Sequence, residues 1–180
     1  MTRTVLTLLL CSAVSTSVSE RARAQSPAAG PTAPVPKAPA DLAQLMRGTL
    51  YPESNVVFAA QDTNPADVKH AADPAMATDL LMSAYGKWQA VENSALAMAE
   101  VSSLLMVTGR KCANGLDVPV NNADWPKFVQ QLRAAGMAAY TAAQTKNQDK
   151  MTEVSDVLTT ACKNCHDRYR DRRRPAERCK

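Results

Sequence analysis

The sequence predicts an all-α fold, an antiparallel up-down-up-down bundle of four helices. Three observations support this prediction. Apolar residues recur at spacings of three and four in four stretches, and no stretch alternates apolar with polar residues as a half-buried strand does. Alanine and methionine are abundant, whereas only 6 of the 180 residues are glycine. The connections are too short for long crossovers, so consecutive helices should run in opposite directions.

The N-terminal segment is expected to lie outside this bundle. Residues 1–24 resemble a secretory signal peptide, because a basic residue and a short apolar run lead to an A-x-A cleavage site that ends at Ala24. A lipoprotein signal would use Cys11, but three leucines precede that cysteine where a small residue should stand. Residues 25–40 are rich in proline and alanine, which predicts a disordered tether. The folded domain is therefore expected at 41–180, exported to the periplasm and without a transmembrane segment.

The positive charge of the chain is concentrated at its C-terminus. The whole chain has a formal net charge of +4, and residues 163–180 carry eight basic and three acidic side chains. Residues 25–162, which lie between the predicted signal peptide and this basic segment, carry a net negative charge. A basic surface confined to one end argues against general nucleic-acid binding.

The first helix is expected to begin after Asp41, which with Gln44 three residues later has the pattern of a capping box. Pro52 cannot donate a hydrogen bond to the carbonyl of Gly48. The sequence therefore predicts a kink or a break at Pro52, after which the helix resumes towards Ala60.

The second helix is expected to be the longest. Asp73 and Pro74 look like an N-cap followed by a first-turn proline, and Gly109 would end the helix. A loop containing Pro65 separates this helix from the first. Its apolar face would comprise Leu81, Tyr85, Trp88, Ala95, Ala99 and Leu105.

The third and fourth helices have clearer starts. The third should begin near Asp124, with Pro126 in its first turn, and the fourth near Asn147. Pro175 should end the fourth helix. The apolar positions of the third are Phe128, Leu132, Ala135, Ala139 and Ala143, and those of the fourth are Met151, Val154, Leu158, Ala161, Cys162, Cys165 and Tyr169.

The fourth helix carries the motif C-K-N-C-H at residues 162–166. On a helix, Cys162, Cys165 and His166 share one face, because residues three and four apart are neighbours. Two such thiols can add to the two vinyl groups of one haem, and the adjacent imidazole can then reach the iron. The motif therefore predicts one covalently attached haem c on the last helix.

Two other uses of the cysteines fit the sequence less well. A zinc site needs three or four protein ligands, and the remaining Cys112, Cys179 and His70 do not form a second C-x-x-C pair. A redox-active C-x-x-C pair belongs at the start of a helix that follows a strand, whereas this pair lies late in a helix of an all-α chain.

The stretch CKNCHDRYR, on the last helix of an exported four-helix chain, resembles the haem motif of the class II cytochromes c, the cytochrome c′ family. The resemblance implies haem c bound through Cys162 and Cys165, with His166 as the proximal iron ligand. Arg170 matches the basic position after the tyrosine and is expected close to the haem, while Tyr169 is expected to pack on the haem or on the helix interface. Family members also often form homodimers through their first two helices.

The second axial position of the iron decides between two functions in this family. A first-helix methionine gives an electron carrier, whereas an open position gives a protein that binds NO or CO. Met46 lies about five residues after the start of its helix, and His166 about five residues before the end of the last helix. In an antiparallel bundle both are roughly 7–8 Å from the same end, which favours Met46 as the ligand.

His70 is a rival ligand, but the predicted topology places it in a loop at the opposite end of the bundle. The other methionines are expected to fill the core. These are Met76, Met82, Met98, Met106, Met137 and Met151.

Two cysteines remain after the haem pair is assigned. Cys112 follows the second helix and Cys179 the fourth, and in an up-down bundle these helix ends lie together, so a disulfide is expected. Arginines at 168, 170 and 172–174 would complement the helix dipole, pair with haem propionates or attract an acidic redox partner. No nucleophile, acid–base pair or phosphate loop suggests an enzyme, so the sequence predicts a periplasmic carrier of single electrons.

Overall fold

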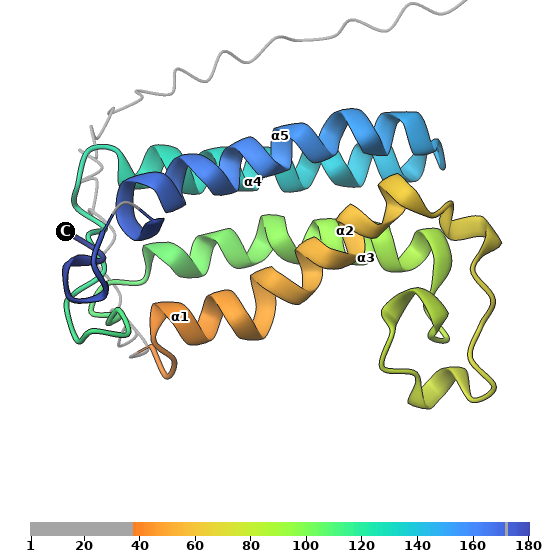
Figure 1. The fold of residues 1–180 in the computed structure, drawn as a ribbon, viewed down its shortest axis with the longest axis horizontal. Helices are drawn as coiled ribbons and strands as arrows, with labels where there is room; N and C mark the ends of the chain where they lie inside the picture. Colours follow the sequence, from red (N-terminus) through yellow and green to blue (C-terminus); the bar gives the residue numbers. More distant parts are fainter. Residues whose placement is uncertain (1–37, 172) are drawn as a thin grey trace, which may run out of the picture. The chain divides into compact units, whose positions relative to one another are not determined.

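The computed structural model describes residues 38–171 and 173–180, and the predicted signal peptide and most of the predicted tether lie outside these residues. The described residues are helical and contain no β-strand, only an isolated bridge between Lys111 and Asp117. The prediction of an all-α fold is therefore confirmed. The α-helices are α1 (Leu42–Leu45), α2 (Tyr51–Asp62), α3 (Lys87–Val101), α4 (Trp125–Gln144) and α5 (Gln148–His166) (Figure 1).

The starts of three helices agree with the sequence. Asp41 and Gln44 form the predicted capping box, each side chain accepting a hydrogen bond of 2.8 Å from the backbone N–H of the other residue. Asp124 is the N-cap residue of α4. The Asn147 side chain caps α5 by accepting a hydrogen bond of 3.1 Å from the backbone N–H of Lys150. Side-chain capping thus accounts for the starts at Asp41 and Asn147, whereas the Asp124 side chain makes no capping hydrogen bond in α4.

The predicted kink or break at Pro52 is replaced by a π-helical turn. This turn, Met46–Leu50, joins α1 to α2, so the chain stays helical from Leu42 to Asp62. The backbone N–H of Tyr51 donates to the carbonyl of Met46, five residues back. Pro52 comes directly afterwards and has no N–H to donate. A π-helical turn admits one extra residue and shifts the faces of the residues that follow it.

The second helix begins later than predicted. Pro74 starts only a short 3₁₀ turn, Pro74–Met76, and the Asp73 side chain makes no capping bond. The α3 helix begins at Lys87, after Gly86. A side chain at Gly86 would collide with the backbone, because a Cβ there would lie 2.3 Å from the carbonyl oxygen of Leu81.

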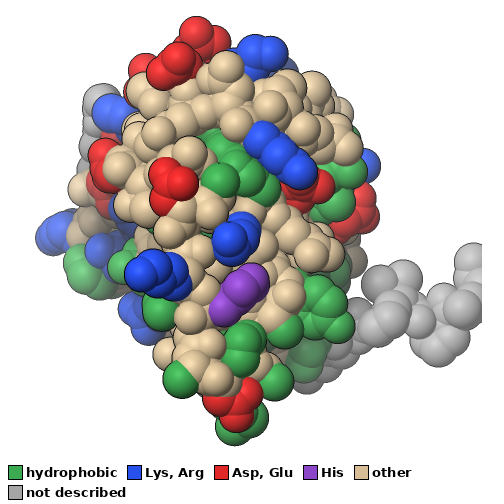
Figure 2. Space-filling view, turned by 90° about the vertical axis from the view of Figure 1, so that its right-hand side faces the viewer, with side chains coloured by type: hydrophobic (Ala, Val, Ile, Leu, Met, Phe, Trp, Pro, Cys, Tyr) green, Lys and Arg blue, Asp and Glu red, His purple; other side chains and the backbone are tan. Residues whose placement is uncertain are grey.

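Residues 63–86 consequently form an irregular excursion with three 3₁₀ turns, Pro65–Asp67, Pro74–Met76 and Leu80–Met82. Tyr85 and Met76, expected in the core, are 69% and 77% exposed. Met137, also expected in the core, is 38% exposed. Figure 2 shows the end of the molecule to which this excursion belongs, with hydrophobic side chains exposed beside basic ones.

The lengths and ends of the helices also differ from the prediction. The longest helix is α4 with 20 residues, whereas α3 has 15. The α3 helix ends at Val101, before the predicted end at Gly109, and the chain continues as a 3₁₀ turn, Ser102–Met106. After α5 it continues as a π-helical turn, Asp167–Asp171, and Pro175 starts a separate 3₁₀ turn.

The helices pack in a closed ring, in which α2 contacts α3, α3 contacts α4, α4 contacts α5, and α5 contacts α2 (Figure 1). The largest side chains that this packing buries completely belong to Trp125, Met98, Met151 and Leu158. Burial of this apolar surface is the main favourable contribution to folding. Of the methionines expected in the core, Met98 and Met151 are thus confirmed there.

Helices α3 and α4 approach each other closely at Gly136 of α4. A Cβ at Gly136 would lie 2.9 Å from the backbone nitrogen of Ala99 and 3.0 Å from the carbonyl oxygen of Ala95 in α3. We expect Gly136→Ala to lower the free energy of unfolding by about 1–3 kcal/mol, because backbone atoms must move apart. Urea denaturation of the purified protein measures this.

The control for that replacement is Gly48→Ala, because a Cβ at Gly48 has no atom within 4 Å. There the change should raise the free energy of unfolding by about 0.4–1 kcal/mol, since alanine loses less conformational freedom than glycine on folding. A Gly136→Ala protein as stable as the unmutated one would contradict this account of the α3–α4 contact.

Candidate functional site

The six residues predicted to form the site all line one cavity of about 640 Å³. Met46 comes from the first π-helical turn, and the others come from the end of α5 and the π-helical turn after it. The structure therefore brings together residues that are more than a hundred positions apart in the sequence. The six residues are Met46, Cys162, Cys165, His166, Tyr169 and Arg170.

The cavity is mainly apolar and its charged lining residues are all basic. The arginines Arg47, Arg170 and Arg178 line it, together with His166, and no aspartate or glutamate among the described residues does. Such a lining suits a ligand with a large apolar body and an anionic edge. The apolar lining includes Leu50, Phe58, Met98, Leu105, Trp125 and Phe128.

The thiols of Cys162 and Cys165 are free and half-buried. Burial raises the pKa of the Cys162 thiol, and burial together with the neighbouring Cys162 raises the pKa of Cys165 to about 11. Both side chains are therefore protonated thiols at neutral pH. This differs from redox-active C-x-x-C pairs, in which the pKa of the attacking thiol is lowered.

His166 is the last residue of α5 and is half-buried in the cavity wall. Burial, followed by the positive charge of Arg170, lowers the pKa of its imidazole. The ring is therefore neutral at pH 7, which is the form that can bind a metal ion.

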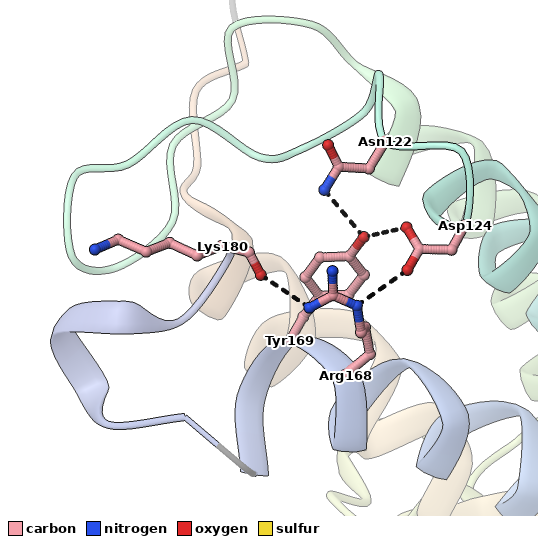
Figure 3. A network of polar contacts seen from close by, with 5 residues as sticks. All are labelled: Asn122, Asp124, Arg168, Tyr169 and Lys180. Carbon is pink, nitrogen blue, oxygen red and sulfur yellow. Dashed lines mark hydrogen bonds and ion pairs between the residues drawn. The ribbon is translucent and has the colours of Figure 1, made fainter.

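A polar network fixes Tyr169 in the cavity wall (Figure 3). The Tyr169 hydroxyl donates a short hydrogen bond to the carboxylate of Asp124 and accepts one of 3.3 Å from the amide of Asn122. Arg168 donates to the same carboxylate through Nε at 3.1 Å and to the backbone carbonyl of Lys180 at 3.2 Å. The network thus connects the π-helical turn after α5, the start of α4 and the C-terminal residue.

Two aromatic side chains also pack against the ring of Tyr169. The ring centroids of Trp125 and Phe128 lie 5.0 and 6.2 Å from that of Tyr169, both with edge-to-face geometry. The hydrogen bond from Tyr169, aided by Arg168, lowers the pKa of Asp124, while burial and that hydrogen bond raise the pKa of Tyr169. Asp124 therefore stays ionised and Tyr169 stays neutral over the physiological pH range. Tyr169 packs at the helix interface, as one of its two predicted placements requires.

His70 does not line the cavity. It lies in the excursion after α2, as predicted, and its exposed ring forms a hydrogen bond of 2.9 Å between Nδ1 and the carbonyl oxygen of Ser83. Within the described chain, the residues near the C-x-x-C-H motif thus include Met46 but not His70.

Cys112 and Cys179 form the predicted disulfide. Both cysteines and the adjoining segments line the cavity. Asn114 adds a second link, because its side-chain amide donates hydrogen bonds to the carbonyls of Pro175 at 3.1 Å and Arg178 at 3.0 Å. The C-terminal segment is thereby held against one side of the cavity.

Several functional candidates escaped the sequence analysis. Arg47 and Arg178 line the cavity, yet only their positions beside Met46 and Cys179 could have drawn attention to them. Trp125 was not singled out either, although tryptophan is rare in this chain. Among the arginines expected near the haem, Arg173 and Arg174 do not line the cavity, and Arg172 lies outside the described residues.

Together, the fold and the site define an all-α protein with a C-x-x-C-H motif in the wall of an apolar cavity lined by arginines. Comparisons with models of known families, with curated protein sequences and with solved structures find no match. No group of three or more histidine, cysteine or acidic side chains in the described residues is arranged to hold a metal ion. No helix in residues 38–171 and 173–180 is long and apolar enough to cross a membrane.

Proposed function

We propose that this chain is a periplasmic monohaem cytochrome c that carries single electrons, with the antiparallel up-down-up-down bundle of the cytochrome c′ family. The observation that carries the proposal is that both thiols and the imidazole of the C-x-x-C-H motif line one apolar cavity with Met46. The sequence pattern alone does not require that the turn with Met46 and the end of α5, which are distant in the sequence, line one cavity.

The residues of the cavity fit a haem. Its volume of about 640 Å³ lies within the range of about 300–1,000 Å³ typical of pockets for organic ligands and cofactors. The apolar walls suit a porphyrin, and the arginines suit its carboxylates. Cys162 and Cys165 are unpaired thiols, which is the form that adds across a vinyl double bond, sulfur to one carbon and hydrogen to the other.

Each residue has a distinct role in this proposal. Cys162 and Cys165 attach the haem, and His166 and Met46 bind its iron from two separate helical segments. The bound haem supplies an iron that changes by one electron between Fe(III) and Fe(II). Tyr169, fixed by Asp124, keeps the wall beside His166 closed to water, which restricts solvent access to the iron.

The charge of the C-terminal segment indicates what kind of redox partner this chain would bind. Residues 163–180 carry a net positive charge near the cavity, which favours an acidic redox partner protein. We infer an electron carrier in preference to an enzyme, because the cavity residues provide attachment and iron ligands but no arrangement for substrate chemistry. Pairing of two chains through the first helices is a further part of the resemblance to the cytochrome c′ family.

Visible spectroscopy of the purified full chain, exported from a host that attaches haem c, tests the proposal. We expect sharp low-spin bands on reduction with dithionite, unchanged by carbon monoxide, because His166 and Met46 would both bind the iron. The haem should remain on the chain after denaturation.

Two results would change the conclusion. A chain without covalent haem under these conditions would overturn the proposal. High-spin bands that shift on addition of carbon monoxide would indicate an open axial position and favour the alternative, a protein that binds NO or CO at its iron.

A further inference from the structure

The arginines that line the cavity differ in their ionic contacts. Arg170 pairs with Asp171 at 2.6 Å, and this contact is the main reason why the pKa of Asp171 is lowered. Arg178 also interacts electrostatically with Asp171, but neither Arg47 nor Arg178 forms a direct ion pair within residues 38–171 and 173–180. Cations beside an apolar cavity without a carboxylate are placed to bind an anionic group of a ligand.

The backbone at Arg178 is held in place by contacts of Arg178 itself and of the next residue, Cys179. Its own carbonyl accepts the hydrogen bond from the Asn114 amide at 3.0 Å. The next residue, Cys179, is joined to Cys112 by the disulfide, and its backbone N–H donates to the carbonyl of Tyr169 at 3.1 Å. The backbone that carries Arg178 is thus attached both to the loop after α3 and to the segment after α5.

Arg47 approaches the cavity from another segment. It follows Met46 in the π-helical turn between α1 and α2 and is exposed towards solvent. Its guanidinium therefore belongs to the rim and not to the apolar interior of the cavity. A guanidinium in such a position can form two parallel hydrogen bonds with a carboxylate.

We propose that Arg47 and Arg178 bind the two haem carboxylates, and that the Cys112–Cys179 disulfide positions Arg178 for this purpose. The inference rests on the proposed function, since it requires haem in the cavity. It gives the C-terminal segment, which lies outside the C-x-x-C-H motif, a specific role in binding the haem.

The test is the midpoint potential of Arg178→Gln and Arg47→Gln, each purified with covalent haem. A paired guanidinium offsets the negative charge of a carboxylate, and that charge stabilises Fe(III) over Fe(II). Each replacement should therefore lower the ratio of reduced to oxidised protein at a fixed potential about threefold to tenfold. A tenfold change corresponds to about 59 mV for one electron.

Arg174→Gln is the matched control. It removes the same charge from the same C-terminal segment, but Arg174 does not line the cavity, is paired with Glu177 and has an 81% exposed side chain. In this variant the ratio of reduced to oxidised protein should change less than twofold, because solvent screens a charge that does not face the cavity. Equal effects of Arg178→Gln and Arg174→Gln would overturn the inference.

Combining Arg178→Gln with Cys112→Ser and Cys179→Ser tests the role of the disulfide. The effect of Arg178→Gln should shrink in the background without the disulfide, since the segment is then less firmly held. An undiminished effect there would overturn the positioning role. Unmutated protein without covalent haem would overturn the proposed function, whereas haem-bound variants with unchanged potentials would overturn this inference alone.

Discussion

Replacing both Cys162 and Cys165 with alanine is expected to abolish covalent attachment of haem. Both thiols line the cavity and are free, and the proposed thioether bonds have no other sulfur in the lining except the disulfide pair and two methionines. Haem staining of the denatured chain and its intact mass measure the attachment. The denatured double variant should show no stain and a mass lower by one haem and two sulfur atoms.

The second pair of cysteines provides the matched control. Cys112→Ala with Cys179→Ala also removes two sulfur atoms from the cavity lining, but should leave the haem attached. This variant should instead lose about 2–4 kcal/mol in the free energy of unfolding, because the disulfide restricts the unfolded chain. Covalent haem that persists in the Cys162 and Cys165 double variant would show that the proposed attachment is wrong.

Replacing Met46 with alanine is expected to open the second axial position of the iron. Met46 lines the cavity with His166 but comes from a different helical segment, so the two side chains can approach one iron from separate elements. The reduced protein should become high-spin and bind carbon monoxide, and its potential should fall, since methionine ligation raises it. Visible spectra with and without the gas measure the first two changes, and a redox titration measures the potential.

Met98 is the control for that experiment, because it also lines the cavity and comes from α3. It is only 1% exposed, so Met98→Ala should lower the free energy of unfolding by about 2–5 kcal/mol through loss of packing. Its spectrum should stay low-spin. If Met98→Ala gave the high-spin spectrum and Met46→Ala did not, the ligand would be Met98.

Features governed by short-range chemistry were predicted well. The capping box at Asp41 and Gln44 and the side-chain cap at Asn147 involve groups within three residues of each other, so the sequence alone contains them. The predicted disulfide also agrees with the structure, because it depends only on the order of the helices and on which ends meet.

Two features of the backbone were predicted poorly. Asp73 and Pro74 have the pattern of a helix start, yet the following residues form 3₁₀ turns, and α3 begins only at Lys87, after Gly86. Pro52 signals a broken helix, but a π-helical turn accommodates it. In both places several backbone conformations satisfy the local pattern, so the pattern alone does not select one.

The sequence by itself determined the chemistry available to this protein, namely two thiols and an imidazole on one helical face and a basic C-terminus. Only the tertiary structure decided that Arg47 and Arg178 line the same cavity as that motif and Met46. The physical reason is that helix periodicity and capping act over a few residues, whereas a cavity forms where segments distant in the sequence pack together. The Asn114 hydrogen bonds, which hold the C-terminal segment there, are contacts of this second kind.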